Sequence, residues 1–231
     1  WDGETPGKLA TLLAERGMGG SKLTVLEALG GPKEKIHRDL ANAAALNTIA
    51  LEVVAGPSAT VIGLAPGLDD ALFENDGQLT KREVRAVTLS ALAPRAGELL
   101  WDIGLGAGSI AIEWLLRHPS LKAIGIEADG VRAARAARNA ARLGTPDLRI
   151  VEGRAPAALA GLPAPDAVFV GGGLSSDAVF EAAWEALRPG GRLVANAVSL
   201  QSEARLIELF QRHGGELRIT SELGRGSCFT L

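Results

Sequence analysis

The chain has 231 residues, of which 47% are hydrophobic and 22% are charged, a balance typical of a soluble globular protein. Its net charge of −3 argues against nucleic acid as a partner, because no positive field would attract a phosphate backbone. One cysteine excludes an internal disulfide, three dispersed histidines indicate no metal site, and no apolar run reaches the roughly 20 residues of a membrane span. We therefore expect a cytoplasmic protein that binds neither a metal nor a membrane.

The first 64 residues form a separate, smaller part of the chain. Hydrophobic patterns predict two helices and two strands here, at Thr5–Arg16, Asp39–Leu46, Leu23–Ala28 and Thr48–Val54. Some sixty residues make a poor independent core, and the sequence starts at Trp1 as though within a domain. We interpret residues 1–64 as a partial α/β segment of a longer protein and place a domain boundary at Ala65, where a loop-like stretch begins.

Residues 65–231 alternate strand and helix patterns, which predicts an α/β fold. Thr80 and Glu83 form a capping-box pattern, in which the Thr80 hydroxyl would bind a free amide at a helix start. Five strands are expected at Leu99–Ile103, Ala123–Glu127, Leu148–Glu152, Ala167–Val170 and Arg192–Ala197, with helices at 108–117, 130–142, 176–187 and 201–213 and a short helix after the third strand. The final strands, Glu216–Ser221 and Ser227–Leu231, predict an antiparallel hairpin that completes a mostly parallel seven-stranded sheet.

The loop after the first of these strands is rich in glycine. Gly104, Gly106 and Gly108 allow a tight turn and bring backbone amides close to a bound ligand. Their spacing, Gly-x-Gly-x-Gly, differs from that of dinucleotide folds, and no Gly-Lys-Ser/Thr follows for a nucleoside triphosphate. The pattern favours S-adenosyl-L-methionine, which has no pyrophosphate. The alternative interpretation is a tight turn with structural glycines alone.

Other strand ends carry further candidate site residues. Glu127 ends the second strand a little over ~20 residues after the glycines, where an acidic side chain meets ribose hydroxyls. Asp102 is a candidate to orient the methionine amino group, or is a carboxylate of a helix end or turn, and Ala155 is expected at the adenine edge. Residues 171–173, all glycine, would leave room for a large flat acceptor, or form a flexible turn. A helix face with arginines at 132, 135, 138 and 142 is expected to be solvated.

These features indicate a Rossmann-like class I methyltransferase domain over residues 65–231. Four segments, 78–85, 101–109, 168–173 and 188–194, resemble the C-terminal domain of the precorrin-6Y C5,15-methyltransferase (decarboxylating) family. Upstream, residues 2–6 and 23–32 resemble the end of the tetrapyrrole-methylase domain in the same family.

The resemblance implies methylation of a precorrin, a tetrapyrrole, at C15 with decarboxylation of an acetate side chain, in cobalamin biosynthesis. It implies S-adenosyl-L-methionine as cofactor, a homo-oligomer such as a tetramer, and no C5 methylation by a chain that lacks the front of the first domain. Arg82 and Arg85 are candidate partners for the acceptor's carboxylates, and no residue is predicted as catalytic. The implied cofactor contacts are Thr80, Gly104, Leu105, Gly106, Ala107, Gly108, Glu127 and Ala155.

Two rival functions remain open from the sequence. A methyltransferase acting on RNA or protein shares this sheet, although the acidic balance and the 4% aromatic content argue against it. A non-catalytic scaffold is the other, and binding of S-adenosylhomocysteine would separate the two classes.

Overall fold

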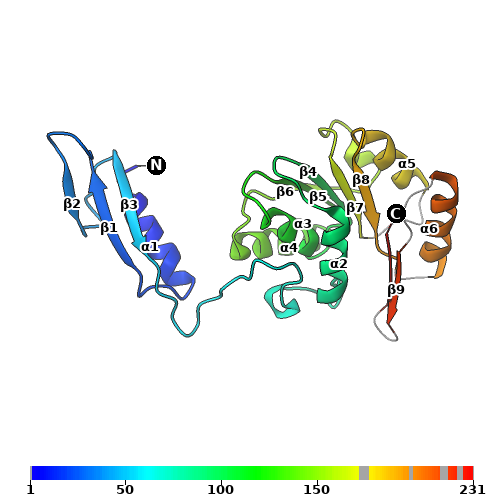
Figure 1. The fold of residues 1–231 in the computed structure, drawn as a ribbon, viewed down its shortest axis with the longest axis horizontal. Coiled ribbons are helices and arrows are strands. Elements are labelled where there is room, and N and C mark those ends of the chain that lie inside the picture. The colour runs from blue at the N-terminus through cyan, green and yellow to red at the C-terminus, as the bar shows by residue number, and fades with distance from the viewer. Residues whose placement is uncertain (1, 172–176, 198–199, 214–217, 223–225, 231) are drawn as a thin grey trace. The chain divides into compact units, whose positions relative to one another are not determined.

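The computed structural model describes the chain except for residues 1, 172–176, 198–199, 214–217, 223–225 and 231. It divides into two compact units, residues 1–62 and 63–231, which are drawn in Figure 1. The boundary expected before Ala65 lies within two residues of this division. Within the described ranges, none of the helices combines the length and apolar character that a membrane span requires.

The first unit is a small antiparallel sheet with one helix. Its elements are α1 (Thr5–Glu15), β1 (Lys22–Glu27), β2 (Lys35–His37) and β3 (Asn47–Glu52), with strand order β2-β1-β3. Val25, in the central strand, is fully buried and lies opposite both His37 and Ile49. Leu13 of α1 and Leu23 of β1 are also buried, so the small core forms between the helix and the central strand.

The predicted helix at Asp39–Leu46 is wrong, and the β2 strand was not predicted. The alanine-rich segment is irregular because polar groups bind its backbone locally. Asp39 Oδ1 accepts a hydrogen bond from Ala41 N at 3.0 Å, and Asn47 Nδ2 donates to Ala44 O at 2.6 Å. The Ala44 amide donates to Glu27 Oε1 at 2.6 Å, which ties the segment to β1.

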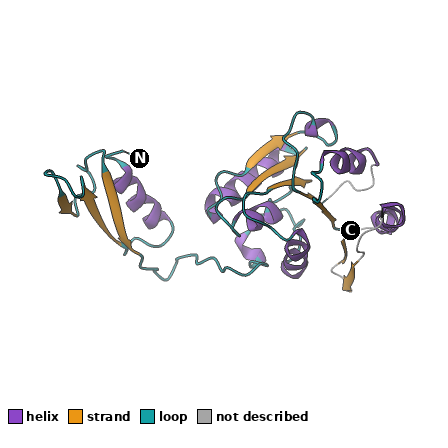
Figure 2. Ribbon diagram, turned by 45° about the horizontal axis from the view of Figure 1, so that its top comes forward, coloured by secondary structure: helices purple, strands orange, loops and turns teal. Residues whose placement is uncertain are grey.

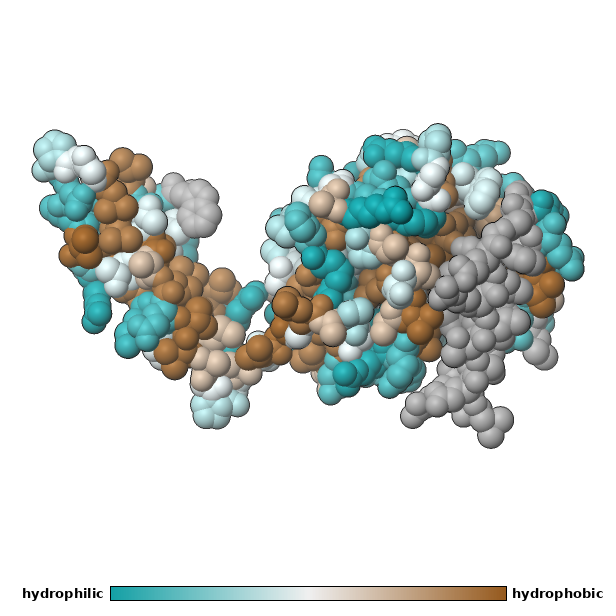
Figure 3. Space-filling model, viewed as in Figure 1, coloured by the Kyte–Doolittle hydropathy of each residue, from teal (hydrophilic) through white to brown (hydrophobic). Residues whose placement is uncertain are grey.

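Many large apolar side chains of the first unit face solvent, and Figure 3 shows brown surface over this unit. Ile36 is 62% exposed, Leu46 75% and Val61 74%. The other exposed ones in this unit are Leu12, Leu29, Leu51, Val53 and Val54. Extensive exposed apolar surface is typical of interaction sites.

The second unit is built on a mostly parallel sheet. Among the described residues its strand order is β6-β5-β4-β7-β8-β10-β9. The five parallel strands are β4 (Leu99–Ile103), β5 (Lys122–Glu127), β6 (Arg149–Glu152), β7 (Ala167–Val170) and β8 (Arg192–Ala195). The antiparallel strands β9 (Arg218–Glu222) and β10 (Gly226–Thr230) lie at the β8 edge; residues 216, 217 and 231 of the predicted hairpin lie outside the described residues. The Rossmann-like fold class is confirmed, with five parallel strands.

Helices cover both faces of this sheet (Figure 2). They are α2 (Arg82–Leu92), α3 (Ser109–Leu115), α4 (Gly130–Leu143), α5 (Asp177–Ala186) and α6 (Leu200–His213), with 3-10 turns at Asp70–Leu72 and Ala157–Leu159. On the face of α5 and α6, Trp101 and Ile103 pack with Phe180 and Leu206 in one buried cluster. Side chains alternate along a strand, so Asp102 points to the opposite face, which α2 and α3 cover. The chain order reverses between β4 and β7, and such a switch point is where ligands bind in open parallel sheets.

Candidate cofactor and acceptor site

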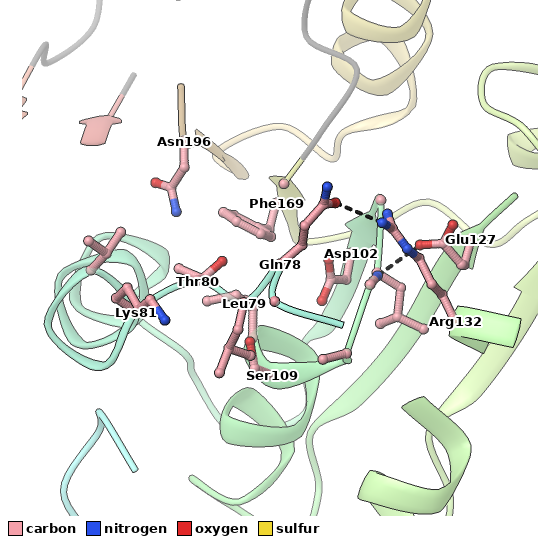
Figure 4. A pocket seen from close by; sticks show the side chains of 18 residues that line it. Gln78, Leu79, Thr80, Lys81, Asp102, Ser109, Glu127, Arg132, Phe169 and Asn196 are labelled. Atoms are coloured by element: carbon pink, nitrogen blue, oxygen red, sulfur yellow. Dashed lines mark hydrogen bonds between the residues drawn. The ribbon is translucent and has the colours of Figure 1, made fainter. Parts of the chain in front are cut away.

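A cavity of about 500 Å³ opens at this switch point. That volume is within the usual range for small-molecule sites. Its walls come from the carboxyl ends of the parallel strands, the loop after β4 and the segment before α2 (Figure 4). Six of the eight predicted cofactor contacts line it: Thr80, Gly104, Leu105, Gly106, Ala107 and Glu127. Asp102, the candidate for the methionine amino group, lines it as well.

The glycine turn has the conformation that its sequence predicts. Gly104, Gly106 and Gly108 have φ values of 79°, 56° and 78°, in the left-handed region that favours glycine. A Cβ at Gly106 would have no atom nearer than 3.9 Å, so this position faces the open cavity. A Cβ at Gly108 would lie 3.2 Å from Ala136 Cβ, because this glycine packs α3 against α4. Gly108 is thus absent from the described lining, and its packing gives a structural reason for the glycine.

Glu127 closes one end of the cavity. Its Oε2 accepts a hydrogen bond from Gly106 N at 2.8 Å, and its Oε1 accepts one from Asp129 N at 3.0 Å. The side chain is buried, yet each carboxylate oxygen keeps a second acceptor site. Glu127 therefore fixes the glycine turn and can still accept hydrogen bonds from a ligand's hydroxyl groups.

Asp102 is a buried carboxyl group in the cavity floor, 1% exposed. Its Oδ2 accepts a hydrogen bond from Ala111 N at 3.1 Å, while its Oδ1 has no hydrogen-bond partner within the described part of the chain. Burial raises the pKa of Asp102 to about 8; the Ala111 amide opposes this rise and the negative charge of Glu127 adds to it. A buried, unpartnered oxygen of this kind is suited to a cationic or hydrogen-bond-donating ligand.

The arginines of α4 bind the chain before α2. The predicted solvated face is correct for the exposed Arg138 and Arg142, but Arg132 and Arg135 are partly buried. Arg132 Nε lies 2.9 Å from Asp76 Oδ2, and its Nη2 donates to Gln78 Oε1 at 2.8 Å. Arg135 Nη1 lies 3.0 Å from the same Asp76 oxygen. The pKa of Asp76 is lowered to about 2, mainly by the hydrogen bond from the Arg135 side chain and next by the hydrogen bond from the Gln78 backbone N–H. Arg138 forms an ion pair with Glu74, and Arg142 donates a hydrogen bond to the Leu72 carbonyl oxygen.

Through these contacts, helix α4 holds in place the segment that carries Gln78 and Thr80 into the cavity wall.

The predicted capping box at Thr80 is also wrong. Helix α2 begins at Arg82, and its N-cap residue, Lys81, makes no side-chain capping bond. Thr80 lies one residue further out, where its side chain lines the cavity and its backbone oxygen accepts a hydrogen bond from Arg85. Thr80 therefore lines the cavity and does not cap α2, and its contact with a cofactor stays a prediction.

Arg85 is not available to a substrate, which corrects the prediction that it binds acceptor carboxylates. Its side chain is fully buried, with Nε donating to Glu113 Oε1 at 2.7 Å and Nη1 donating to Asp70 Oδ1 at 2.8 Å. Glu113 also accepts the amides of Gly67 and Leu68, at 2.7 and 2.9 Å. This network fastens the loop before α2 to α2 and α3. Arg82 is exposed and is absent from the described lining of the cavity.

The side chains that line the cavity but were not assigned to the site from the sequence include Lys81, Phe169 and Asn196. Asn196 directly follows β8, and its Nδ2 donates to the hydroxyl of the buried Thr88 on α2 at 3.1 Å. Phe169 is in β7. Asn196 lies inside the strand predicted at Arg192–Ala197, whereas β8 ends at Ala195, so the predicted strand end hides a residue at the ligand-binding edge of the sheet.

The remaining predicted positions lie partly outside this lining. Ala155 is half-buried and packs against the core on the α5 and α6 side, and its contact with adenine stays a prediction. Gly171 lines the cavity, whereas Gly172 and Gly173 lie outside the described residues.

The fold and the site define a Rossmann-like class I methyltransferase domain: a parallel sheet with a reversal at β4 and β7, a glycine turn after β4 and an acidic residue at the end of β5. The family model described as "Precorrin methyltransferase domain" matches residues 71–225. The chain therefore belongs to the precorrin methyltransferase family.

Named relatives agree with this assignment. A precorrin-6Y C(5,15)-methyltransferase [decarboxylating] from Sinorhizobium sp is 59% identical over 222 residues, covering 94% of this chain and 54% of the relative. A probable cobalt-precorrin-6B C(15)-methyltransferase (decarboxylating) from Pyrobaculum calidifontis is 38% identical over 160 residues, covering 67% of this chain and 82% of the relative. The crystal structure of the C-terminal domain of precorrin-6Y C5,15-methyltransferase from Rhodobacter capsulatus has a TM-score of 0.65 at 47% identity, covering 74% of this chain and 94% of that domain. The chain spans about half the length of the curated precorrin-6Y relatives that it matches.

Proposed function

We propose that this chain transfers a methyl group from S-adenosyl-L-methionine to C15 of a precorrin and that the same acceptor loses carbon dioxide from an acetate side chain. The observation that carries the proposal is the cavity at the switch point, where the glycine turn, Glu127 and Asp102 meet. This cavity belongs to the second unit, in which the family model matches residues 71–225. The shorter relative, named as a probable cobalt-precorrin-6B C(15)-methyltransferase (decarboxylating), is matched over 82% of its own length.

The residues of the cavity fit S-adenosyl-L-methionine. Glu127 has acceptor capacity for the two ribose hydroxyls, and the open position at Gly106 lets the backbone approach the ligand closely. The unpartnered Oδ1 of Asp102 suits the methionine ammonium group. Thr80, Leu105 and Ala107 contribute the surrounding wall, and we keep Ala155 and Gly108 in the proposed contact set on the family resemblance alone.

The chemistry needs alignment more than a protein nucleophile. S-adenosyl-L-methionine, when bound, supplies a methyl group already activated on a sulfonium. C15 of the acceptor provides the electron pair of the new carbon–carbon bond, so the ring system gains one positive charge. Loss of carbon dioxide from an acetate carboxylate returns an electron pair to the conjugated ring and cancels that charge, so the two reactions balance. The chain's own residues bind and orient: Phe169 and Asn196 line the cavity away from Glu127, where the acceptor ring would enter.

We further propose that residues 1–64 are the C-terminal remnant of a tetrapyrrole-methylase domain. The alignment with the Sinorhizobium relative covers 94% of this chain and so includes most of the first unit. The exposed apolar side chains of this unit are consistent with a surface that further chain would cover. Methylation at C5 is not expected of this chain alone, and a precorrin-bound homo-oligomer in the cytoplasm remains our expectation.

The position of the new methyl group tests the proposal. The chain is incubated with reduced precorrin-6 and S-adenosyl-L-methionine carrying a ¹³C-labelled methyl, and the product is analysed by NMR. We expect a single labelled methyl, at C15. A label at C5, or transfer to RNA but not to the precorrin, would contradict the proposal, and absence of S-adenosylhomocysteine binding would favour the scaffold alternative.

A further inference from the structure

Lys81 occupies the end of the cavity opposite Glu127. Figure 4 shows Lys81 near Thr80 on one side of the cavity, with Glu127 and Arg132 on the other side. The side chain is 51% exposed and Lys81 lines the cavity, so its ammonium group is open to solvent beside the cavity. If the ribose binds at Glu127, as the proposed function holds, Lys81 lies at the end left for other ligand groups.

The ammonium group of Lys81 is weakly paired within the protein. Its ion pair with Asp70 is long, 3.8 Å from Nζ to Oδ2, and Asp70 is already bound by Arg85 through its other oxygen at 2.8 Å. An exposed pair of this length contributes little to stability. The other cation in the described lining, Arg132, is held by Asp76 and Gln78. Lys81 is therefore the lining cation that is best able to bind an anion.

Local stability gives no reason for a lysine at this position. Lys81 is the N-cap residue of α2, where Ser, Thr, Asp or Asn would satisfy a free backbone amide, and it makes no such bond. A cation there also opposes the helix dipole, whose positive end lies at the N-terminus. The ammonium group and the N-terminal amides of α2 together give this end of the cavity a positive potential that attracts an anion.

We propose that Lys81 binds a carboxylate of the precorrin acceptor by a direct ion pair from Nζ. The inference rests on the proposed function and deepens it, because precorrins carry several acetate and propionate side chains. It replaces the sequence-based candidates: Arg85 is sequestered by Glu113, and the Arg82 side chain runs beside Gly67, with Cγ 3.4 Å from the place of a Cβ there. A carboxylate is also present on the methionine part of the cofactor, so the experiment has to separate the two sources.

The test compares Lys81→Met with Lys81→Arg and with Arg82→Met, a matched loss of charge one residue away and outside the described lining. In Lys81→Met we expect the KM for the reduced precorrin to rise about 10- to 100-fold, as for the loss of one charge-assisted hydrogen bond. The kcat, the KM for S-adenosyl-L-methionine and the Kd for S-adenosylhomocysteine should stay within about twofold. Lys81→Arg should restore most of the affinity for the acceptor, and Arg82→Met should behave as the unchanged chain.

The outcomes separate this inference from the proposed function. If the unchanged chain binds S-adenosylhomocysteine but does not turn over the precorrin, the proposed function fails. If it does turn over and Lys81→Met keeps the KM for the precorrin, the inference about Lys81 fails alone. A raised Kd for S-adenosylhomocysteine in Lys81→Met assigns the lysine to the cofactor's carboxylate and overturns the inference. Lys81→Gln repeats the measurement should the methionine variant not fold, as judged by thermal unfolding.

Discussion

The carboxyl group of Asp102 should release a proton when a ligand's ammonium group binds beside it, and Asp102→Asn should abolish this release. Because burial raises the pKa of Asp102 to about 8, about 0.9 of the side chains carry a proton at pH 7 in the free chain. A cation next to the unpartnered Oδ1 lowers a carboxyl pKa by about 1 to 3 units, so binding should release about 0.4 to 0.9 proton. Asparagine keeps the shape and the acceptor for Ala111 N but has no proton to release.

Isothermal titration of S-adenosylhomocysteine at pH 7, in buffers with different ionisation enthalpies, measures this release directly. The observed enthalpy should depend on the buffer in the unchanged chain and not in Asp102→Asn. The affinity should rise with pH between pH 6 and 8 in the unchanged chain and stay flat in the variant. A buffer-independent enthalpy in the unchanged chain would refute the placement of the ammonium group beside Asp102.

The same pKa shift also makes stability depend on pH. The folded chain keeps the Asp102 proton up to about pH 8, whereas the unfolded chain loses it near 3.8, so folded-state stability falls as pH rises between these values. The effect is about 6 kcal/mol at most. Urea unfolding of Asp102→Asn should lose this pH dependence, and an identical dependence in both chains would assign it to other groups.

Three further predictions concern the turn, the ribose site and the buried network. Gly106→Ala should cost about 1 to 2 kcal/mol of folding stability, because this glycine has a positive φ. Gly161→Ala is the matched control, since Gly161 also has a positive φ and a Cβ there would also meet open space. Only Gly106→Ala should lose S-adenosylhomocysteine binding, and equal binding by both variants would contradict a cofactor at the turn. Glu127→Gln should weaken that binding about 10-fold or more by calorimetry, since a carboxylate acceptor becomes an amide; an unchanged Kd would place the ribose elsewhere. Arg85→Met should lower the free energy of unfolding by about 3 to 5 kcal/mol in urea titrations, because Glu113 would be left as an unpaired buried charge; a loss under about 1 kcal/mol would argue against this reasoning.

The alternating fold of the second unit could be predicted because its strands are short apolar runs between clear helix patterns. The predicted parallel strands and the four longer helices that follow them along the chain end within two residues of the observed ends. The segment at 39–46 shows the limit of such reasoning. Its alanines favour a helix locally, but bonds from Asp39, Asn47 and Glu27 fix it as an irregular segment, and their partners are not visible in a sequence window.

The same limit explains the errors at the site. The glycine turn and Glu127 follow from strand order and spacing, so their place at the cavity could be predicted. The role of Arg85 could not, because its partner Glu113 lies 28 residues further along the chain. The Thr80 pattern matched a capping box by spacing alone, and the helix starts two residues later, at Arg82. Long-range ion pairs decide which cations remain available to a ligand.

The most direct test of the central claim is the mass balance of one turnover. The chain is incubated with reduced precorrin-6 and labelled S-adenosyl-L-methionine, and the acceptor is analysed by mass spectrometry, with Gly106→Ala as the control that should not bind the cofactor. We predict that the acceptor gains one labelled methyl group and loses one carbon dioxide. An acceptor that stays unchanged, although the chain demonstrably binds S-adenosylhomocysteine, would contradict the claim.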